Sequence, residues 1–245
     1  MAETFLLLQQ RPEDAASDNE YEAFLKFSGL AATQLRRERV ENGVFPEIDL
    51  ARYSGILLGG GPYNVTSHPD EKKTNEQLKF EAELAKLIER VISWDFPFLA
   101  ACGIGVIVQS QGGRVSRKYP EPVGATTIRI TEEGKHEPLL KDLPEVFEAF
   151  AGHKEACESL PPNAILLATS DVCPVQMFRF KKNVYATQFH SELDSDGLAL
   201  RIQIYKHKGY FKPEEAEALT EEVRRHNVTE PIKILRNFVK IHQRN

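Results

Sequence analysis

A thiol that could act as a nucleophile stands at the centre of this sequence. Cys102 follows an apolar run that begins near Pro97, and it precedes Gly103, Gly105 and a second apolar run. Such an order of strand, tight turn and helix is typical of a nucleophile elbow. The first N–H groups of the helix would lie beside the thiol, where they lower a thiol pKa and bind an oxyanion. Cys102 is therefore our candidate nucleophile, and the alternative is a small buried core residue.

An imidazole and a carboxylate that could assist this thiol occur in the last third of the chain. His190 and Glu192 end an apolar run and are separated by Ser191. Side chains alternate along an extended segment, so we expect His190 and Glu192 to project to one side and Ser191 to the other. A carboxylate in this position orients the imidazole and stabilises its protonated form. The alternative for the His190 and Glu192 pair is a surface ion pair.

Three glycines follow a predicted buried strand at 54–58. Gly59, Gly60 and Gly61 would bring bare backbone N–H groups to the end of that strand, where an oxyanion or a substrate could approach closely. The alternative is a tight turn that needs positive φ angles. The run lacks the spacing of a dinucleotide site and the Lys-Ser/Thr of a P-loop, so we do not expect nucleotide binding there.

Short apolar runs and helical periodicities together predict an α/β fold. The predicted strands are 4–9, 34–40, 54–58, the run before Cys102, 122–131, 146–150, 164–169, 175–180 and 184–189, the last two joined as a hairpin by 181–183. The predicted helices are 20–30, 74–93, one directly after Cys102, 198–205, 213–225 and 231–241, and 11–19 is expected to be a loop.

Strands and helices alternate in the first half of the chain. This alternation predicts parallel strands with right-handed crossovers, which place the glycine run and Cys102 at the same edge of the sheet. After Gly112 strands follow one another directly, which predicts an antiparallel or mixed section. His153 follows one of these strands and could face the site, although a loop histidine is commonly just solvated.

Composition limits the remaining function classes. The chain has 245 residues, of which 41% are hydrophobic and 27% charged, enough for one large domain or two small ones. A net charge of -5 gives no broad electrostatic footprint for nucleic acid or an anionic membrane. The sequence shows no leader and no apolar run of about 20 residues, so we expect a cytoplasmic protein. Its three cysteines fit neither a disulfide framework nor a zinc cluster.

These motifs, in this order, resemble those of class I glutamine amidotransferases. The resemblance rests on Gly60-Gly61-Pro62, on Cys102, and on Phe189 to Glu192, and it covers about 53–192. Within the family, the glutaminase domain of GMP synthase and similar stand-alone proteins are the most alike. The resemblance implies a mixed, mostly parallel central sheet flanked by helices in a three-layer, flavodoxin-like arrangement. We expect one such domain over 1–245, with a helical C-terminal extension from about 195 to 245.

The resemblance also implies roles for individual residues. Cys102 would attack the carboxamide of glutamine, His190 would accept the thiol proton and then protonate departing ammonia, and Glu192 would orient His190. The backbone N–H groups of Gly60 or Gly61 and of Gly103 would hold the oxyanion.

The family resemblance extends to the substrate and the partner. Glutamine would be the substrate, with no cofactor and no metal. Ammonia would pass to a separate synthetase subunit, since no ATP-binding synthetase is evident in 245 residues. Two alternatives stay open, namely a γ-glutamyl or related cysteine amidase and a non-catalytic regulatory relative.

The elbow differs from the family pattern, which reads Gly-x-Cys-x-Gly with a glutamine soon after. Here Ala100 and Ile104 flank Cys102 at those positions, and Val106 stands where the glutamine is expected. We expect Ile104 to crowd the turn, so that either the backbone shifts or activity is reduced. Ser191 replaces the family's proline, a milder change.

Overall fold

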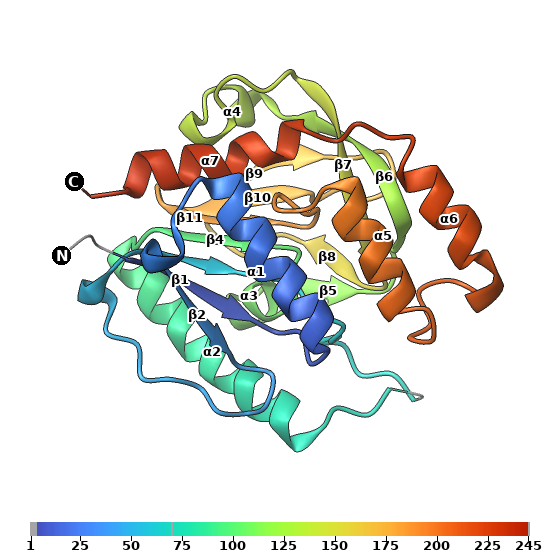
Figure 1. The fold of residues 1–245 in the computed structure, drawn as a ribbon. Coiled ribbons are helices and arrows are strands. Elements are labelled where there is room, and N and C mark those ends of the chain that lie inside the picture. The colour runs from blue at the N-terminus through green and yellow to red at the C-terminus, as the bar shows by residue number, and fades with distance from the viewer. Residues whose placement is uncertain (1–3, 70, 245) are drawn as a thin grey trace.

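A nine-stranded sheet forms the centre of the protein, whose computed structural model describes residues 4–69 and 71–244 (Figure 1). The strand order is β2-β1-β3-β4-β11-β10-β9-β6-β7. These strands are β1 (Thr4–Gln9), β2 (Leu35–Arg39), β3 (Tyr53–Leu58), β4 (Phe98–Ala101), β6 (Glu121–Ile130), β7 (Val146–His153), β9 (Ala164–Thr169), β10 (Met177–Phe180) and β11 (Val184–Thr187). A second, two-stranded sheet of β5 (Arg114–Ser116) and β8 (Ala156–Ser159) was not predicted from the sequence.

The sheet is mixed, as expected. The strands from β2 to β11 in this order run parallel to one another. From β11 onward, β10, β9, β6 and β7 pair antiparallel, and β10 and β11 form the predicted hairpin. The parallel half therefore carries the carboxyl ends of β1, β3, β4 and β11 to one edge.

The central strands are apolar because both faces of the sheet are covered. Leu6 and Leu8 of β1 belong to the core on one face, whereas Phe5 and Leu7 belong to the core on the other. A strand buried on both sides reads as a continuous apolar run rather than as an alternating pattern. This explains why the run at 4–9 identified β1 so clearly.

Helices form the two outer layers (Figure 1). The helices are α1 (Asp14–Ser28), α2 (Asn75–Trp94), α3 (Gly105–Ser110), α4 (Glu132–Lys135), α5 (Ser195–Ile204), α6 (Ala216–Val223) and α7 (Glu230–His242). Short 3₁₀ turns lie at η1 (Ala32–Gln34), η2 (Leu50–Arg52), η3 (Pro138–Leu140) and η4 (Pro213–Glu215). Buried side chains of α2 and α3 pack on one face of the sheet, and those of α1 and α7 pack on the other.

The first helix starts earlier than the sequence indicated. We expected 11–19 to be a loop, but α1 begins at Asp14. Ser17 and Glu20 are fully buried on this helix, and Gln9 of β1 donates hydrogen bonds to both through its Nε2 atom. The expectation was wrong because the polar side chains of this segment face a buried polar network rather than water.

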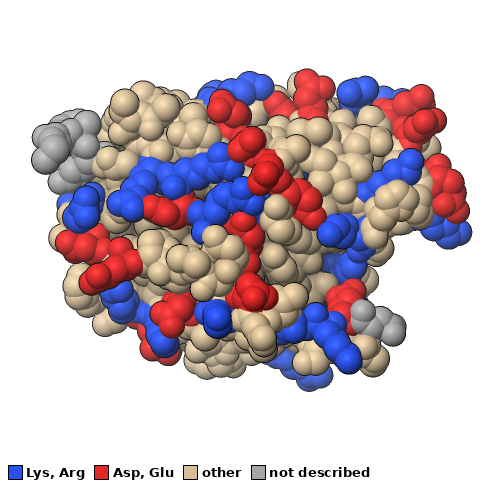
Figure 2. Space-filling model, turned by 60° about the horizontal axis from the view of Figure 1, so that its bottom comes forward, with Lys and Arg blue, Asp and Glu red and all other residues tan. Residues whose placement is uncertain are grey.

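Charged groups of both signs cover the surface. On the face in Figure 2, Lys and Arg side chains are interspersed with Asp and Glu. The edge strand β2 carries Arg36, Arg37 and Arg39, each of which forms an ion pair with a nearby carboxylate. Charges on an edge strand oppose pairing with another sheet. Among the described helices, none has the length and apolar character to cross a membrane.

The start of α2 can be tested directly. Thr74 caps this helix, because its Oγ1 atom accepts a hydrogen bond from the Gln77 N–H at 3.1 Å. We expect Thr74→Ala to lower the free energy of unfolding by about 1 kcal/mol, measured by urea denaturation. Thr33→Ala, at an exposed position in η1, is the control and should change it by less than about 0.5 kcal/mol. Equal effects would show that Thr74 does not act as a cap.

Candidate active site

Four loops meet at one edge of the sheet because the strands before them are parallel. They follow β1, β3, β4 and β11, and they carry Arg11, the glycine run, Cys102 and His190. Ligands of open parallel sheets bind outside the carboxyl ends of the strands. The expectation that the glycine run and Cys102 share an edge is confirmed.

Cys102 occupies a strained turn between β4 and α3. Its φ angle is 58°, in the left-handed region that non-glycine residues rarely adopt. The Cys102 N–H donates a hydrogen bond to the carbonyl oxygen of Thr187 at 2.9 Å, which ties the elbow to the end of β11. Helix α3 begins soon afterwards, at Gly105. The predicted order of strand, elbow and helix is present.

We expected Ile104 to crowd this elbow, but it does not. Its side chain is only 3% exposed and belongs to the core cluster beneath the turn. Gly103 and Gly105 are both closely packed, because a Cβ atom would lie 3.0 Å from the Gly59 carbonyl oxygen and 2.9 Å from Val65, respectively.

The glycine run is required by close packing rather than by backbone conformation. Gly59, Gly60 and Gly61 do not have positive φ angles, so the tight-turn alternative is wrong. A Cβ atom at Gly61 would lie 2.5 Å from the carbonyl oxygen of Gln10, and one at Gly60 would lie 3.4 Å from Cβ of Cys102. The run therefore passes directly beside Cys102.

His190 and Glu192 form a buried pair. The Nδ1 atom of His190 lies 2.8 Å from Oε1 of Glu192, and Glu192 is 0% exposed. A surface ion pair is therefore excluded. The segment leaves β11 at Thr187 and is held by the His190 N–H, which donates to the carbonyl oxygen of Phe150 at 2.9 Å. Ser191 is also fully buried.

The surroundings of His190 favour its protonated form. Burial by itself lowers the pKa of His190, but the charge of Glu192 and the contact with the Cys102 thiol raise it to about 9. Burial raises the pKa of Glu192, and the positive charges of His190, Arg201 and Arg11 outweigh this and hold it well below its usual range. Glu192 thus stays ionised and the imidazolium is stabilised.

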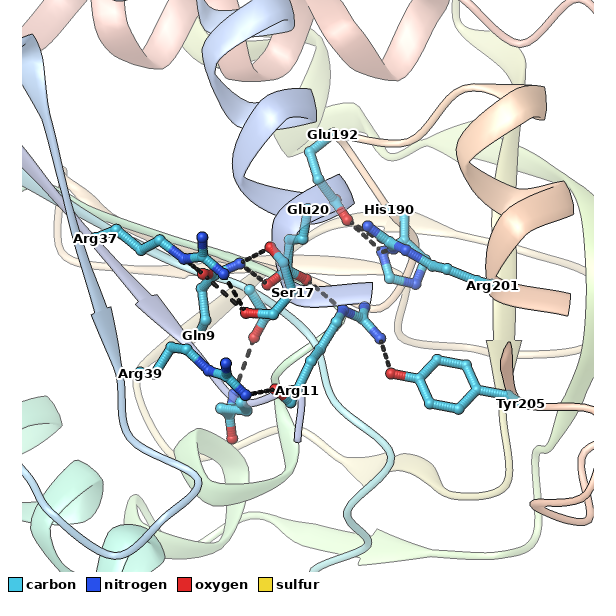
Figure 3. Close-up of polar contacts among 12 residues, drawn as sticks. Gln9, Arg11, Ser17, Glu20, Arg37, Arg39, His190, Glu192, Arg201 and Tyr205 are labelled. Carbon is cyan, nitrogen blue, oxygen red and sulfur yellow. Dashed lines mark hydrogen bonds and ion pairs between the residues drawn. The ribbon is translucent and has the colours of Figure 1, made fainter. Parts of the chain in front are cut away.

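Two arginines that the sequence analysis did not single out complete this site (Figure 3). Arg201 of α5 is 4% exposed, and its Nη1 atom lies 3.0 Å from Oε1 of Glu192 and 3.3 Å from Nδ1 of His190. Arg11 donates from Nε to Glu20 at 2.7 Å and from Nη1 to the Tyr205 hydroxyl at 3.1 Å. Arg201 and His190 thus share one carboxylate oxygen.

The buried charges in Figure 3 compensate one another. Arg11 is matched by Glu20, and Arg201 is matched by Glu192. An imidazolium at His190 therefore adds one positive charge to a balanced set, and this charge lies next to the Cys102 thiol.

Arg11 could have been found from the sequence, because it lies two residues after a clear parallel strand and so at the functional edge. Arg201 gave no such signal, since one arginine on a predicted amphipathic helix normally faces water. Its place depends on how α5 docks against the sheet.

Two cavities open on either side of Cys102. The first, of about 650 Å³ out to bulk solvent, presents polar side chains together with the elbow backbone at Gly103 and Gly105. Its polar lining comprises Gln10, Asn64, Glu81, His153, Lys154, Glu155 and Gln188, and apolar side chains such as Val65, Phe80 and Val115 form the rest of its wall. The second cavity has a volume of about 500 Å³, again counted out to bulk solvent. It is lined by His190, Arg11 and Arg201 and by apolar and aromatic side chains. The thiol therefore stands between two spaces of different character.

We expected His153 to lie in a loop, but it is the last residue of β7. It is buried, and its Nε2 atom lies 2.8 Å from the Glu121 carboxylate. Ligand atoms of Glu121, His153 and Cys173 lie within 4.8 Å of one another, so this is where the described residues could hold a metal ion. The Glu121 carboxylate, however, already accepts hydrogen bonds from Thr126, Ser170 and Gln176 as well. These hydrogen bonds hold the buried carboxylate in place, and His153 also lines the first cavity beside Cys102, as the sequence allowed.

Comparison with known proteins agrees with this architecture. The family model described as glutamine amidotransferase class-I matches residues 24–199. One subunit of the glutamine-hydrolysing GMP synthase of Methanocaldococcus jannaschii is 31% identical over 142 residues, covering 57% of this chain and 64% of that protein. The subunit of the same name from Methanococcus maripaludis is 32% identical over 174 residues, covering 69% of this chain and 78% of that protein.

A solved structure shares the fold. A glutamine amidotransferase from Thermotoga maritima matches with a TM-score of 0.74 at 21% identity, and the match covers 100% of both chains. The fold is thus that of an α/β protein with a mixed sheet between two helical layers. With the family model matching most of its length, the chain belongs to the glutamine amidotransferase class-I family.

The three thiols should differ sharply in reactivity. Cys102 is partly exposed at the elbow, whereas Cys157 and Cys173 are buried and burial raises the pKa of each to about 12. We expect iodoacetamide at pH 7 to modify Cys102 first, measured by peptide mass mapping over time. The Cys102→Ala variant is the control and should be modified only slowly. Comparable rates at all three positions would contradict an activated Cys102.

Arg201 should control both stability and the pH dependence of the site. Arg201→Met leaves the Glu192 charge buried with less compensation, so we expect the free energy of unfolding to fall by about 3–5 kcal/mol. Removing a positive neighbour also lets the imidazolium hold its proton more tightly. Wild-type kcat/KM should decline as the pH rises through about 9, and this decline should move to higher pH in the variant.

The matched control is Arg225→Met, which removes an exposed ion pair with Glu222. It should change stability by less than about 0.5 kcal/mol and leave the pH profile in place. Arg201→Lys should restore part of the wild-type profile. If the pH dependence of kcat/KM is the same in Arg201→Met as in the wild type, Arg201 has only a structural role.

Proposed function

We propose that this protein hydrolyses the side-chain amide of glutamine through a cysteinyl thioester and releases ammonia. The observation that carries the proposal is the buried His190–Glu192 pair beside a cysteine with a φ angle of 58° at the head of a helix. A thiol, a base and a carboxylate that orients the base are the parts that acyl transfer requires. Membership of the glutamine amidotransferase class-I family supports the choice of amide.

In the first step, the Cys102 thiolate attacks the carboxamide carbon of glutamine. The backbone N–H groups of Gly60 or Gly61 and of Gly103 receive the developing oxyanion, and such a donor contributes about 3 kcal/mol in comparable hydrolases. As the carbon–nitrogen bond breaks, His190 gives its proton to the nitrogen, and ammonia departs. A glutamyl thioester on Cys102 remains.

In the second step, water hydrolyses the thioester. His190, now neutral, takes a proton from the water as the water attacks, and the Cys102 thiolate leaves. Glu192 keeps the proton of His190 on Nδ1 during the cycle, so that Nε2 faces the reacting atoms. Glutamate is released and the thiolate–imidazolium pair is restored.

The released ammonia would serve a separate synthetase subunit. Support comes from the relatives, whose names describe them as one subunit of a glutamine-hydrolysing GMP synthase. The chain spans 64% of the length of the M. jannaschii protein, so the match concerns part of that protein. A partner of this kind should bind the purified chain and raise its rate of glutamine hydrolysis.

Ammonia release from glutamine by the purified chain tests the proposed activity. Cys102→Ala should abolish it, and Glu192→Gln should lower kcat by about 10²-fold or more because the imidazole loses its orienting charge. Cys157→Ala, which removes a buried thiol away from the elbow, is the control and should retain activity. Activity that survives in Cys102→Ala would overturn the proposal.

A further inference from the structure

The two cavities beside Cys102 differ in which reacting group they serve. The first contains the elbow backbone at Gly103, where the oxyanion and the acyl part of a substrate would lie. His190 lines the second. Because His190 must protonate the departing nitrogen, that nitrogen has to lie on the side of the second cavity. Any substituent on the nitrogen is then directed into this space.

The walls of the second cavity suit an apolar group. They include Val123, Leu198, Ile202 and Phe211, together with the rings of Tyr205 and Tyr210. Ammonia has no apolar surface and gains nothing from such walls. An aromatic ring buries about 150–250 Å² and gains most from a concave apolar site.

The charges of this cavity do not call for an anionic substituent. Its two guanidinium groups, of Arg11 and Arg201, are already paired with Glu20 and Glu192. A further carboxylate would unbalance the buried set of charges. A neutral arylalkyl group is the better match.

From this geometry we infer that the second cavity is a leaving-group subsite, and that the enzyme cleaves γ-glutamyl amides whose nitrogen carries a neutral apolar or aromatic substituent. The inference rests on the proposed thioester chemistry at Cys102 and extends it to a wider class of amide. Glutamine, with an unsubstituted nitrogen, leaves this subsite empty.

The reaction balances without a further reagent. The Cys102 thiolate forms a bond to the γ-carbonyl carbon, the carbon–nitrogen bond breaks, and His190 supplies the proton that lets the substituted amine depart neutral. Water then cleaves the thioester to give glutamate and the free thiol. The acyl group and its acceptor are those of glutamine hydrolysis, and only the leaving amine differs.

The test compares amides whose leaving amines differ in size. Ammonia and benzylamine are close in basicity and methylamine is a stronger base, so variants of the cavity separate the effect of size from that of basicity. Glutamine, γ-glutamylmethylamide and γ-glutamylbenzylamide are each supplied to the wild-type protein and to Cys102→Ala, and released glutamate is measured. We expect kcat/KM for the benzylamide to exceed that for the methylamide by about tenfold or more, since burial of a ring is worth at least this factor. All activity should vanish in Cys102→Ala.

Two positions on α5 provide a matched pair of variants. Leu198 lines the cavity, whereas Leu200 is 38% exposed on the same helix. Leu198→Ala should reduce the benzylamide to methylamide ratio at least threefold, and Leu200→Ala should leave it unchanged. Phe211→Ala, at a half-buried position less critical for folding, should also reduce the ratio. Thermal unfolding of each variant shows that it is folded.

The outcomes separate the two proposals. Cleavage of glutamine but not of the benzylamide would overturn the subsite and leave the proposed function standing. A benzylamide preference that Leu198→Ala and Phe211→Ala do not reduce would place the ring elsewhere and also overturn the subsite. Failure to cleave any of the three amides would overturn both proposals. Preference for the benzylamide, lost in both cavity variants, supports the subsite.

Discussion

The buried carboxylate of Glu192 is the constraint on which the site depends. A carboxylate removed from water costs several kcal/mol unless it is paired, and Glu192 is 0% exposed. His190 and Arg201 share its Oε1 atom, and Arg11 adds a further positive charge nearby. Because Arg11 itself needs Glu20, the requirement extends from the base to α1. The charged network therefore connects helices and loops that are distant in sequence.

The parallel half of the sheet supplies the other constraint. Four strands end at the same edge, and the loops that leave them can approach closely only where side chains are absent. Gly61 against Gln10 and Gly103 against Gly59 are such contacts. The strained φ angle of Cys102 is maintained by this packing and by the hydrogen bond to Thr187. The backbone at Cys102 is thus fixed by contacts within the chain itself.

The sequence predicted those parts of the fold that follow from local pattern. β1 and β3 were evident as apolar runs, α2 from its period and its cap, and the elbow from the order of strand, cysteine and glycines. What could not be predicted depends on long-range docking. The start of α1 was missed because Ser17 and Glu20 face a buried network, and Arg201 because only the docked position of α5 brings it to Glu192. The glycine run was found, but its reason was undecided until the contacts were known.

The hydrogen bond from Arg11 to Tyr205 has a consequence for synthesis of the chain. These residues are 194 positions apart, so the network that holds His190 joins segments that are made at very different times. β4, which presents Cys102, has β11 as its neighbour, and β11 is made much later in synthesis. On the ribosome, an exposed strand edge and an unassisted thiol therefore precede the finished enzyme. The proposed site is therefore assembled only after β11 and Tyr205 have been made.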